Sequence, residues 1–287
     1  MNKLDRRIHA YRPDLADARL EGQVEAERFV TGTPARIVAP KSGLFRHPSP
    51  DAPLDTEALR GDPVNILEKA EEGWNWVQLG QDDYVGWMPA NDMVAGAPEP
   101  THRVCVPSTF VFCAPDIKSR PLESLSLGSG VTAIGEARDH NAHYAKIEPA
   151  GAIVLQHLVP ADHMADDFVT VAETLTGTPY YWAGNSAFGI DCSALVQLAL
   201  RMAGHRAPRD SDMQEALLGT ALDIAAGIPP LRRGDLVFWK GHVGIMQDGE
   251  RLLHANAHHM AVASEPLTEA ISRLAAAGCP VTAIRRL

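Results

Sequence analysis

The sequence predicts an α+β protein in which helices pack on an antiparallel sheet, with two small β-barrels in front of it. Short runs rich in β-branched and aromatic residues follow one another between residues 31 and 100 and are separated by turns. Residues 193–204 form an apolar run that ends in glycine, which is typical of a buried helix. Between residues 234 and 254, strand-like runs alternate with short glycine-containing turns, and this pattern indicates an antiparallel sheet.

The composition limits the kinds of partner. A chain of 287 residues is long enough for two or three domains, and 22% charged residues is ordinary for a soluble protein. Its net charge of −10 comes without clusters of Lys and Arg, so we expect no nucleic-acid partner and no membrane surface. Small molecules or short peptides are the expected partners, and the oligomeric state is left open.

The N-terminal residues, the lack of a long apolar stretch and the cysteines predict a cytoplasmic location. Residues 1–13 contain basic side chains but no apolar run of seven behind them, so they do not form a secretory signal. No stretch approaches the roughly 20 apolar residues that span a bilayer. The cysteines are too few and too scattered for a disulfide framework. A bridge between Cys105 and Cys113 stays open as an alternative to two ordinary thiols.

The first half of the chain divides into three segments. Residues 1–30 are polar and predict an arm or a short helix, and residues 31–100 predict the first barrel. This second segment resembles a bacterial SH3-like domain through the motifs at residues 59–64, 74–79 and 84–88. After a Pro- and Gly-rich loop, residues 101–160 predict a second and more divergent barrel of the same kind. Tryptophans Trp74, Trp76 and Trp87 are expected in the barrel core rather than on a sugar-binding surface.

The remaining residues, 161–287, predict the mixed domain. A helix is expected over residues 166–175 and a final helix over Thr268–Ala277. Between residues 180 and 192, a loop with glycines brings Cys192 to the start of the buried helix. Unpaired N–H groups at a helix N-terminus favour thiolate over thiol, which predicts a lowered pKa for Cys192. The alternative is a cysteine that only packs in the core.

Two histidines lie in consecutive predicted strands after this cysteine. A thiol nucleophile needs an imidazole that accepts its proton, and that imidazole needs a partner that orients it. His242 and His254 are the candidates, but they share a face only if paired positions in the hairpin sum to an even number. A two-residue turn at Asp248–Gly249 does not allow this, so we predict an odd-length loop or a bulge.

These residues belong to five ordered motifs that resemble the NlpC-type cysteine peptidases of bacterial cell-wall metabolism, over residues 165–287. The motifs are Tyr180-Tyr-Trp-Ala-Gly-Asn-Ser with Gly-Ile-Asp-Cys192-Ser-Ala-Leu, Pro208-Arg-Asp-Ser211 with Gln214, Gly234-Asp-Leu-Val-Phe-Trp, His242-Val-Gly-Ile, and Leu253-His-Ala-Asn256. The resemblance implies a papain-like fold with Cys192 as nucleophile, His242 as general base and acid, and His254 as the residue that orients it. It also implies that the hydroxyl of Tyr180 helps to bind the oxyanion; packing under the loop is the alternative role for this tyrosine.

The sequence departs from the family pattern at two positions. Ala183 and Ala194 stand where family members commonly have glycine. An extra methyl group is tolerable unless the backbone needs a positive φ at that position.

Barrels in front of such a domain resemble the subgroup that trims peptides recovered from peptidoglycan. That subgroup cuts the bond between γ-D-glutamate and the following L-diamino acid, and it requires a free N-terminal L-alanine. The resemblance implies that Asp210 binds the ammonium group and that Ser211 holds the substrate, although Asp210 also fits a helix N-cap. It further implies an acid and a tyrosine from the first barrel, for which the candidates are Glu57 and Tyr84; a plain strand aromatic is the alternative for Tyr84.

The resemblance therefore implies a cysteine endopeptidase that acts on murein-derived short peptides in cell-wall recycling, without a cofactor. An amidase or acyltransferase on the same scaffold, or a non-catalytic binding protein for wall peptides, are the alternatives. A zinc site at His254, His258 and His259 is disfavoured, because no further ligand stands at a suitable spacing. The sequence leaves open whether the diamino acid is diaminopimelate or lysine.

Overall fold

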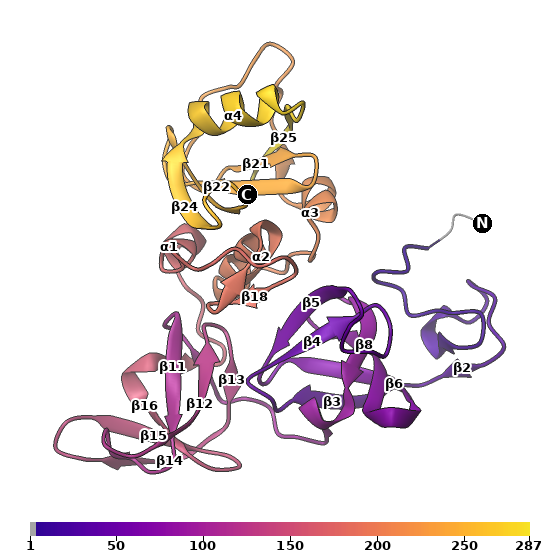
Figure 1. Ribbon diagram of the computed structural model, residues 1–287, viewed down its shortest axis with the longest axis vertical. Helices are drawn as coiled ribbons and strands as arrows, with labels where there is room; N and C mark the ends of the chain where they lie inside the picture. The colour runs from indigo at the N-terminus through magenta and orange to yellow at the C-terminus, as the bar shows by residue number, and fades with distance from the viewer. Residues whose placement is uncertain (1–3) are drawn as a thin grey trace. The chain divides into compact units, whose positions relative to one another are not determined.

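The computed structural model describes residues 4–287, which form two compact units joined near residue 162 (Figure 1). The first unit ends at Asp162 and the second extends from His163 to Leu287. Residues 1–3 of the predicted N-terminal arm lie outside the described residues. No helix within residues 4–287 has the length and apolar character that crossing a membrane requires.

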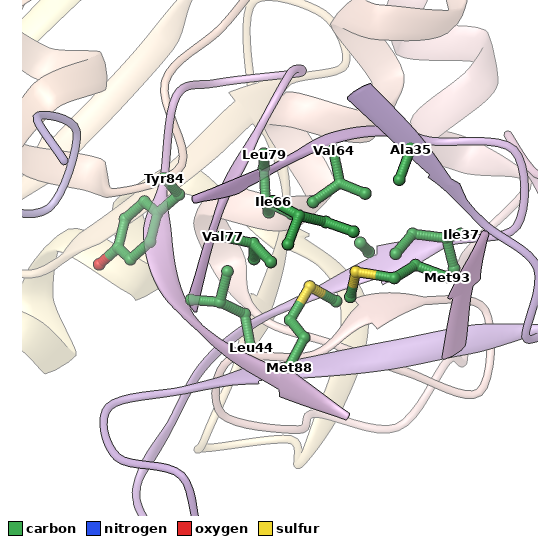
Figure 2. Close-up of a cluster of buried hydrophobic side chains, with 11 residues drawn as sticks. Ala35, Ile37, Leu44, Val64, Ile66, Val77, Leu79, Tyr84, Met88 and Met93 are labelled. Carbon is green, nitrogen blue, oxygen red and sulfur yellow. The ribbon is translucent and has the colours of Figure 1, made fainter. Parts of the chain in front are cut away.

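The first predicted barrel is a seven-stranded antiparallel sheet. In sheet order its strands are β5 (Leu54–Leu59), β4 (Lys41–Phe45), β8 (Val85–Pro89), β7 (Trp74–Leu79), β6 (Pro63–Lys69), β3 (Thr33–Ile37) and β9 (Met93–Ala95). Alternate residues point inward, as the period of two in a strand requires. Figure 2 shows the resulting core, in which Ile37, Leu44, Val77 and Met88 converge, and Tyr84 lies at its edge with the hydroxyl pointing away from the other side chains.

The N-terminal arm packs on the outside of this barrel. Ala10 and Leu15 are buried against Leu67 and Trp76 of the barrel. Arg12 lies over the Trp76 ring, with its guanidinium carbon 4.3 Å from the ring centroid. Trp87 was expected in the barrel core but is only half-buried, because it faces the arm instead. The short elements of the arm are β1 (Ala16–Asp17), η1 (Ala18–Leu20) and β2 (Phe29–Val30).

Residues 102–160 form two further antiparallel sheets. One contains β13 (Gly130–Val131), β10 (His102–Val104) and β17 (Leu158–Pro160); the other contains β12 (Pro121–Ser126), β11 (Ser108–Phe112), β16 (Ala152–Val154), β15 (His143–Ile147) and β14 (Ala133–Arg138). They enclose a separate core that includes Val111, Leu125 and Ile153. The assignment of this segment as a second SH3-like barrel stays a prediction.

The second unit is built around a six-stranded antiparallel sheet. In sheet order its strands are β20 (Thr220–Ala221), β25 (Val281–Arg286), β21 (Leu236–Trp239), β22 (His242–Met246), β23 (Arg251–Asn256) and β24 (Ala261–Pro266). The helices are α1 (Phe168–Glu173), α2 (Cys192–Met202), α3 (Ser211–Leu217) and α4 (Leu267–Ala276). Helix α4 packs on one face of this sheet and α2 on the other (Figure 1). A small hairpin, β18 (Asn185–Ser186) with β19 (Gly189–Ile190), precedes α2.

The register of the β22–β23 hairpin confirms the prediction of an odd-length loop. Ile245 pairs with Leu253 and Met246 with Leu252, so paired positions sum to an even number. The backbone N–H of Gln247 donates a hydrogen bond to the carbonyl of Arg251 across the turn, which leaves a loop of three residues, 248–250. His242 and His254 therefore share a face of the sheet.

Candidate active site

The loop before Cys192 is fixed by the carboxylate of Asp191. Asp191 caps helix α2: its Oδ1 accepts a hydrogen bond from the N–H of Ala194 at 2.8 Å. Its Oδ2 accepts one from the N–H of Ala183 at 3.0 Å. Ala183 adopts a left-handed backbone with a φ of 64°, whereas Ala194 lies inside the helix. The departure from glycine is thus strained at the first position and harmless at the second.

A buried arginine, Arg209, holds the start of α3 to the start of α2. Its Nη2 lies 2.6 Å from Asp191 Oδ2 and its Nη1 donates to Ser193 Oγ at 2.9 Å, although the side chain is almost fully buried. Gln214 adds a hydrogen bond from Nε2 to the carbonyl of Ser193 at 2.9 Å. The Pro208–Ser211 motif contained Arg209, but no local pattern indicated its distant partner.

Cys192 is the first residue of α2 and is nearly buried, with 7% of its surface exposed. Burial raises the pKa of its thiol to about 12, and the negative charge of Asp191 acts in the same direction. Backbone N–H groups of Val243 and Ser193 act against this rise. The expected lowering of the pKa is wrong, because burial and the capping carboxylate outweigh the helix N-terminus. In the resting protein Cys192 is therefore a neutral thiol.

The two histidines form a hydrogen-bonded pair. Nε2 of His242 lies 2.8 Å from Nδ1 of His254. Both rings lie on the sheet face that packs on α4, since Trp239 and Leu252 on that face share a core with the helix. Cys192 lies at the N-terminal end of β22, next to Val243. Burial lowers the pKa of His242 to about 3 and that of His254 to about 4, so both rings are neutral at pH 7.

Glu265 on β24 extends this pair to a third residue. Its Oε1 lies 2.7 Å from Nε2 of His254, and its two oxygens accept hydrogen bonds from Arg273 of α4 at 2.7 and 2.5 Å. Burial alone would raise the pKa of this carboxyl, but the hydrogen bonds from Arg273 and His254 lower it to about 2. Sequence reasoning missed Glu265. Its position could have been found from the β23–β24 register, where it pairs with Leu252 and so lies diagonally across from His254.

Tyr180 lies close to the thiol. Burial raises its pKa to about 12, and the neighbouring Cys192 and Asp191 add to the rise. Its backbone N–H donates to the carbonyl of Met260 at 2.9 Å. The phenol therefore keeps its proton at neutral pH and is able to donate a hydrogen bond.

The four predicted substrate-binding residues fall in two places. Asp210 occupies the N-cap position of α3, as its alternative role required, although no cap hydrogen bond from its side chain is formed; Ser211 is the first residue of that helix. Tyr84 belongs to the core of the first barrel. Glu57 is buried on β5 of the same barrel and forms an ion pair with Lys41. The roles of all four in substrate binding stay predictions.

One group of side chains within the described chain has the composition of a metal site. His254, His259 and Glu265 have potential ligand atoms within 4.8 Å of one another. Both nitrogens of His254 already form hydrogen bonds, to His242 and Glu265, so a cation would have to displace the second of these. His258, named in the disfavoured zinc alternative, instead packs edge to face against His259, with ring centroids 4.8 Å apart.

Comparison with known proteins decides the family. The model of the NlpC/P60 family matches residues 177–276. The Escherichia coli protein named "Probable endopeptidase NlpC" is 32% identical over 112 residues, which cover 34% of this chain and 70% of that protein. The chain belongs to the NlpC/P60 family. A second model, described as a bacterial dipeptidyl-peptidase Sh3 domain, matches residues 44–93, so the SH3-like nature of the first barrel is confirmed.

Other relatives of this NlpC/P60 peptidase match more of the chain and extend into its N-terminal unit. Dipeptidyl-peptidase 6 of Lysinibacillus sphaericus is 27% identical over 77% of this chain and 87% of that protein. Two proteins named gamma-D-glutamyl-L-lysine dipeptidyl-peptidase are similar. The one from Bacillus subtilis is 28% identical over 77% of this chain and 78% of its own length; the one from Bacillus cereus is 27% identical over 73% and 64%.

Solved structures confirm the papain-like NlpC/P60 fold. The crystal structure of an NlpC/P60 family protein from Bacillus cereus aligns with a TM-score of 0.71 at 21% identity, over 88% of this chain and 99% of that one. An NlpC/P60 endopeptidase from Photobacterium damselae aligns with a TM-score of 0.59 at 14% identity, over 93% and 74%.

Proposed function

We propose that this protein is a cytoplasmic cysteine endopeptidase that hydrolyses the bond between γ-D-glutamate and the L-diamino acid in short murein peptides with a free N-terminal L-alanine. The observation that carries the proposal is the position of Cys192, at the start of α2, beside the backbone of Val243, the residue after His242, which is hydrogen-bonded to His254. The specificity is supported by the two relatives named for the γ-D-glutamyl-L-lysine bond.

In the proposed acylation step, His242 accepts the thiol proton as the sulfur of Cys192 attacks the γ-carbonyl carbon. Since the resting thiol is neutral and the ring is neutral, the proton moves during the attack rather than before it. The carbonyl oxygen becomes an oxyanion, which the hydroxyl of Tyr180 and a backbone N–H at Cys192 stabilise. His242 then gives its proton to the leaving amine, the C–N bond breaks, and a thioester remains on Cys192.

In the proposed deacylation step, a water molecule repeats the sequence. His242 takes a proton from the water as its oxygen attacks the thioester carbon. The C–S bond then breaks, the sulfur recovers the proton from His242, and L-Ala-D-Glu leaves. No cofactor enters either step.

Selectivity for a free amino end requires an anionic group for the ammonium. Asp210 is our candidate. It follows Arg209, whose guanidinium donates a hydrogen bond to Asp191, the residue before the nucleophile Cys192. Ser211 would hold the substrate backbone, and Glu57 and Tyr84 of the first barrel would close the site. A cytoplasmic location is supported by the four cysteines, which are all free in the part of the chain that the structure describes.

The test compares L-Ala-γ-D-Glu-L-Lys and the diaminopimelate equivalent with the same peptides acetylated at the amino end. We expect release of L-Ala-D-Glu, followed by mass spectrometry, from the free peptides only. Asp210→Asn should reduce kcat/KM on the free peptides at least about tenfold, because one charge-assisted hydrogen bond is worth roughly 1.5–3 kcal/mol, and Asp212→Asn is the matched control on α3. Equal cleavage of free and acetylated peptides would exclude an ammonium pocket.

A further inference from the structure

We propose that Glu265 is a positioning residue of the catalytic site: acting through His254, it fixes the ring protons so that Nδ1 of His242 is the atom that accepts the thiol proton. This inference deepens the proposed cysteine-peptidase function and rests on it. It adds a residue from β24 to the Cys192–His242–His254 triad that the resemblance implied.

The partners in these hydrogen bonds determine which ring nitrogens carry protons. A carboxylate can only accept, so Nε2 of His254 must carry the proton that is shared with Glu265 at 2.7 Å. A neutral imidazole has one N–H, so Nδ1 of His254 must be an acceptor. Nε2 of His242, 2.8 Å away, must then carry the proton of that hydrogen bond. This leaves Nδ1 of His242 with a lone pair, which is the state that a general base for Cys192 requires.

The surroundings of Glu265 keep its carboxylate ionised and oriented. Only 5% of Glu265 is exposed, and Arg273 on α4 donates to both of its oxygens. His254 faces it from β23, and His259 lies within 4.8 Å from the turn before β24. Glu269 on α4 is exposed, and its charge acts on Arg273. The positive charge of Arg273 thus favours the ionised over the protonated form of Glu265.

The same chain of hydrogen bonds matters when charge develops. As His242 takes the thiol proton it becomes an imidazolium, and the hydrogen bond that its Nε2–H donates to His254 strengthens. His254 can polarise toward Glu265 because its Nε2–H already donates a hydrogen bond to the negatively charged carboxylate. Without the carboxylate, His254 is free to carry its proton on Nδ1. That N–H would then point at the N–H on Nε2 of His242, and the hydrogen bond between the two rings would be lost.

The first test is Glu265→Gln in the full-length protein, with Glu269→Gln as the matched control on α4. We expect kcat on L-Ala-γ-D-Glu-L-Lys to fall about 10- to 100-fold for Glu265→Gln, the same loss that follows removal of the hydrogen-bond partner of a metal-binding histidine. KM should stay within about threefold, because Glu265 does not touch the substrate. Glu269→Gln should keep both constants. Circular dichroism and a thermal melt check that each variant is folded.

The second test does not depend on the substrate. The rate of alkylation of Cys192 by iodoacetamide is measured between pH 6 and 11, with the other cysteines replaced by alanine. At pH 7, where His242 must take the proton, Glu265→Gln should react about tenfold more slowly than wild type. At pH 11 hydroxide competes as the base, so the two rates should converge.

A folded Glu265→Gln protein with wild-type kcat and a superimposable alkylation profile would overturn the inference. An equal loss of alkylation rate at every pH would also overturn it, since that result indicates general damage to the fold. If wild type cleaves none of the peptides, the proposed specificity fails, but the alkylation profiles still decide the role of Glu265.

Discussion

At the scale of single residues, Ala183 and Ala194 show how one substitution can have opposite consequences. Ala183 is left-handed, with a φ of 64°, and Ala194 is the third residue of α2. For Ala183→Gly, relief of backbone strain should roughly offset the lost methyl burial and the added chain entropy, so the free energy of unfolding should change by less than about 0.5 kcal/mol. Ala194→Gly should lose about 2 kcal/mol. Urea denaturation measures both, and equal losses would contradict the strain at Ala183.

A second residue-scale prediction concerns acid stability. Burial lowers the pKa of His242 from 6.5 to about 3, so between these values the unfolded chain binds a proton that the folded chain does not. The free energy of unfolding should therefore fall as the pH falls below 6.5, by up to about 1.4 kcal/mol per pH unit, and be insensitive to this group above 6.5.

His242→Gln removes that proton and should make the stability profile less steep between pH 6.5 and 5, while His254, whose pKa is lowered to about 4, still contributes its own slope. Denaturation curves at half-unit steps give the slopes, and the same variant at pH 7.5–8.5 is the control. Parallel profiles for wild type and variant would show that His242 is not buried in its neutral form.

At the scale of elements, the Asp191–Arg209 pair joins the starts of α2 and α3. Arg209 is 2% exposed, so its removal leaves the Asp191 carboxylate buried without its main partner. Arg209→Met should cost about 3–5 kcal/mol of unfolding free energy. The exposed Arg206, three residues earlier, is the control and should cost less than about 0.5 kcal/mol when changed to Met. A small effect at Arg209 would mean that water or another group replaces it.

The elements themselves were largely predictable, whereas their distant contacts were not. Apolar periodicity and glycine placed α2 within two residues of its observed limits, and the parity of the hairpin correctly excluded a two-residue turn at 248–249. Glu265 was not predicted, because its contact with His254 depends on the β23–β24 register, and no turn motif in the sequence determines that register. The pKa of Cys192 was predicted in the wrong direction, since burial is a property of the packed molecule and not of the local sequence.

At the scale of the whole molecule, the two units have separate cores. The cores of the first unit contain residues of that unit alone, and the sheet of the second packs on its own helices. Residues 163–287 expressed alone should therefore fold, and Cys192 should still react with iodoacetamide. If Glu57 and Tyr84 close the site, this fragment should discriminate less between free and acetylated peptides than the full chain, even though it retains Asp210. Unchanged selectivity would assign the preference to the second unit.

The central claim is that Cys192 hydrolyses the γ-D-glutamyl–L-diamino acid bond. The most direct test is mass spectrometry of the products formed from L-Ala-γ-D-Glu-L-Lys by wild type and by Cys192→Ala at equal concentration. The account predicts L-Ala-D-Glu and free lysine from wild type and no cleavage above background from the variant. Cleavage of another bond by wild type, or the same products at the wild-type rate from Cys192→Ala, would contradict it.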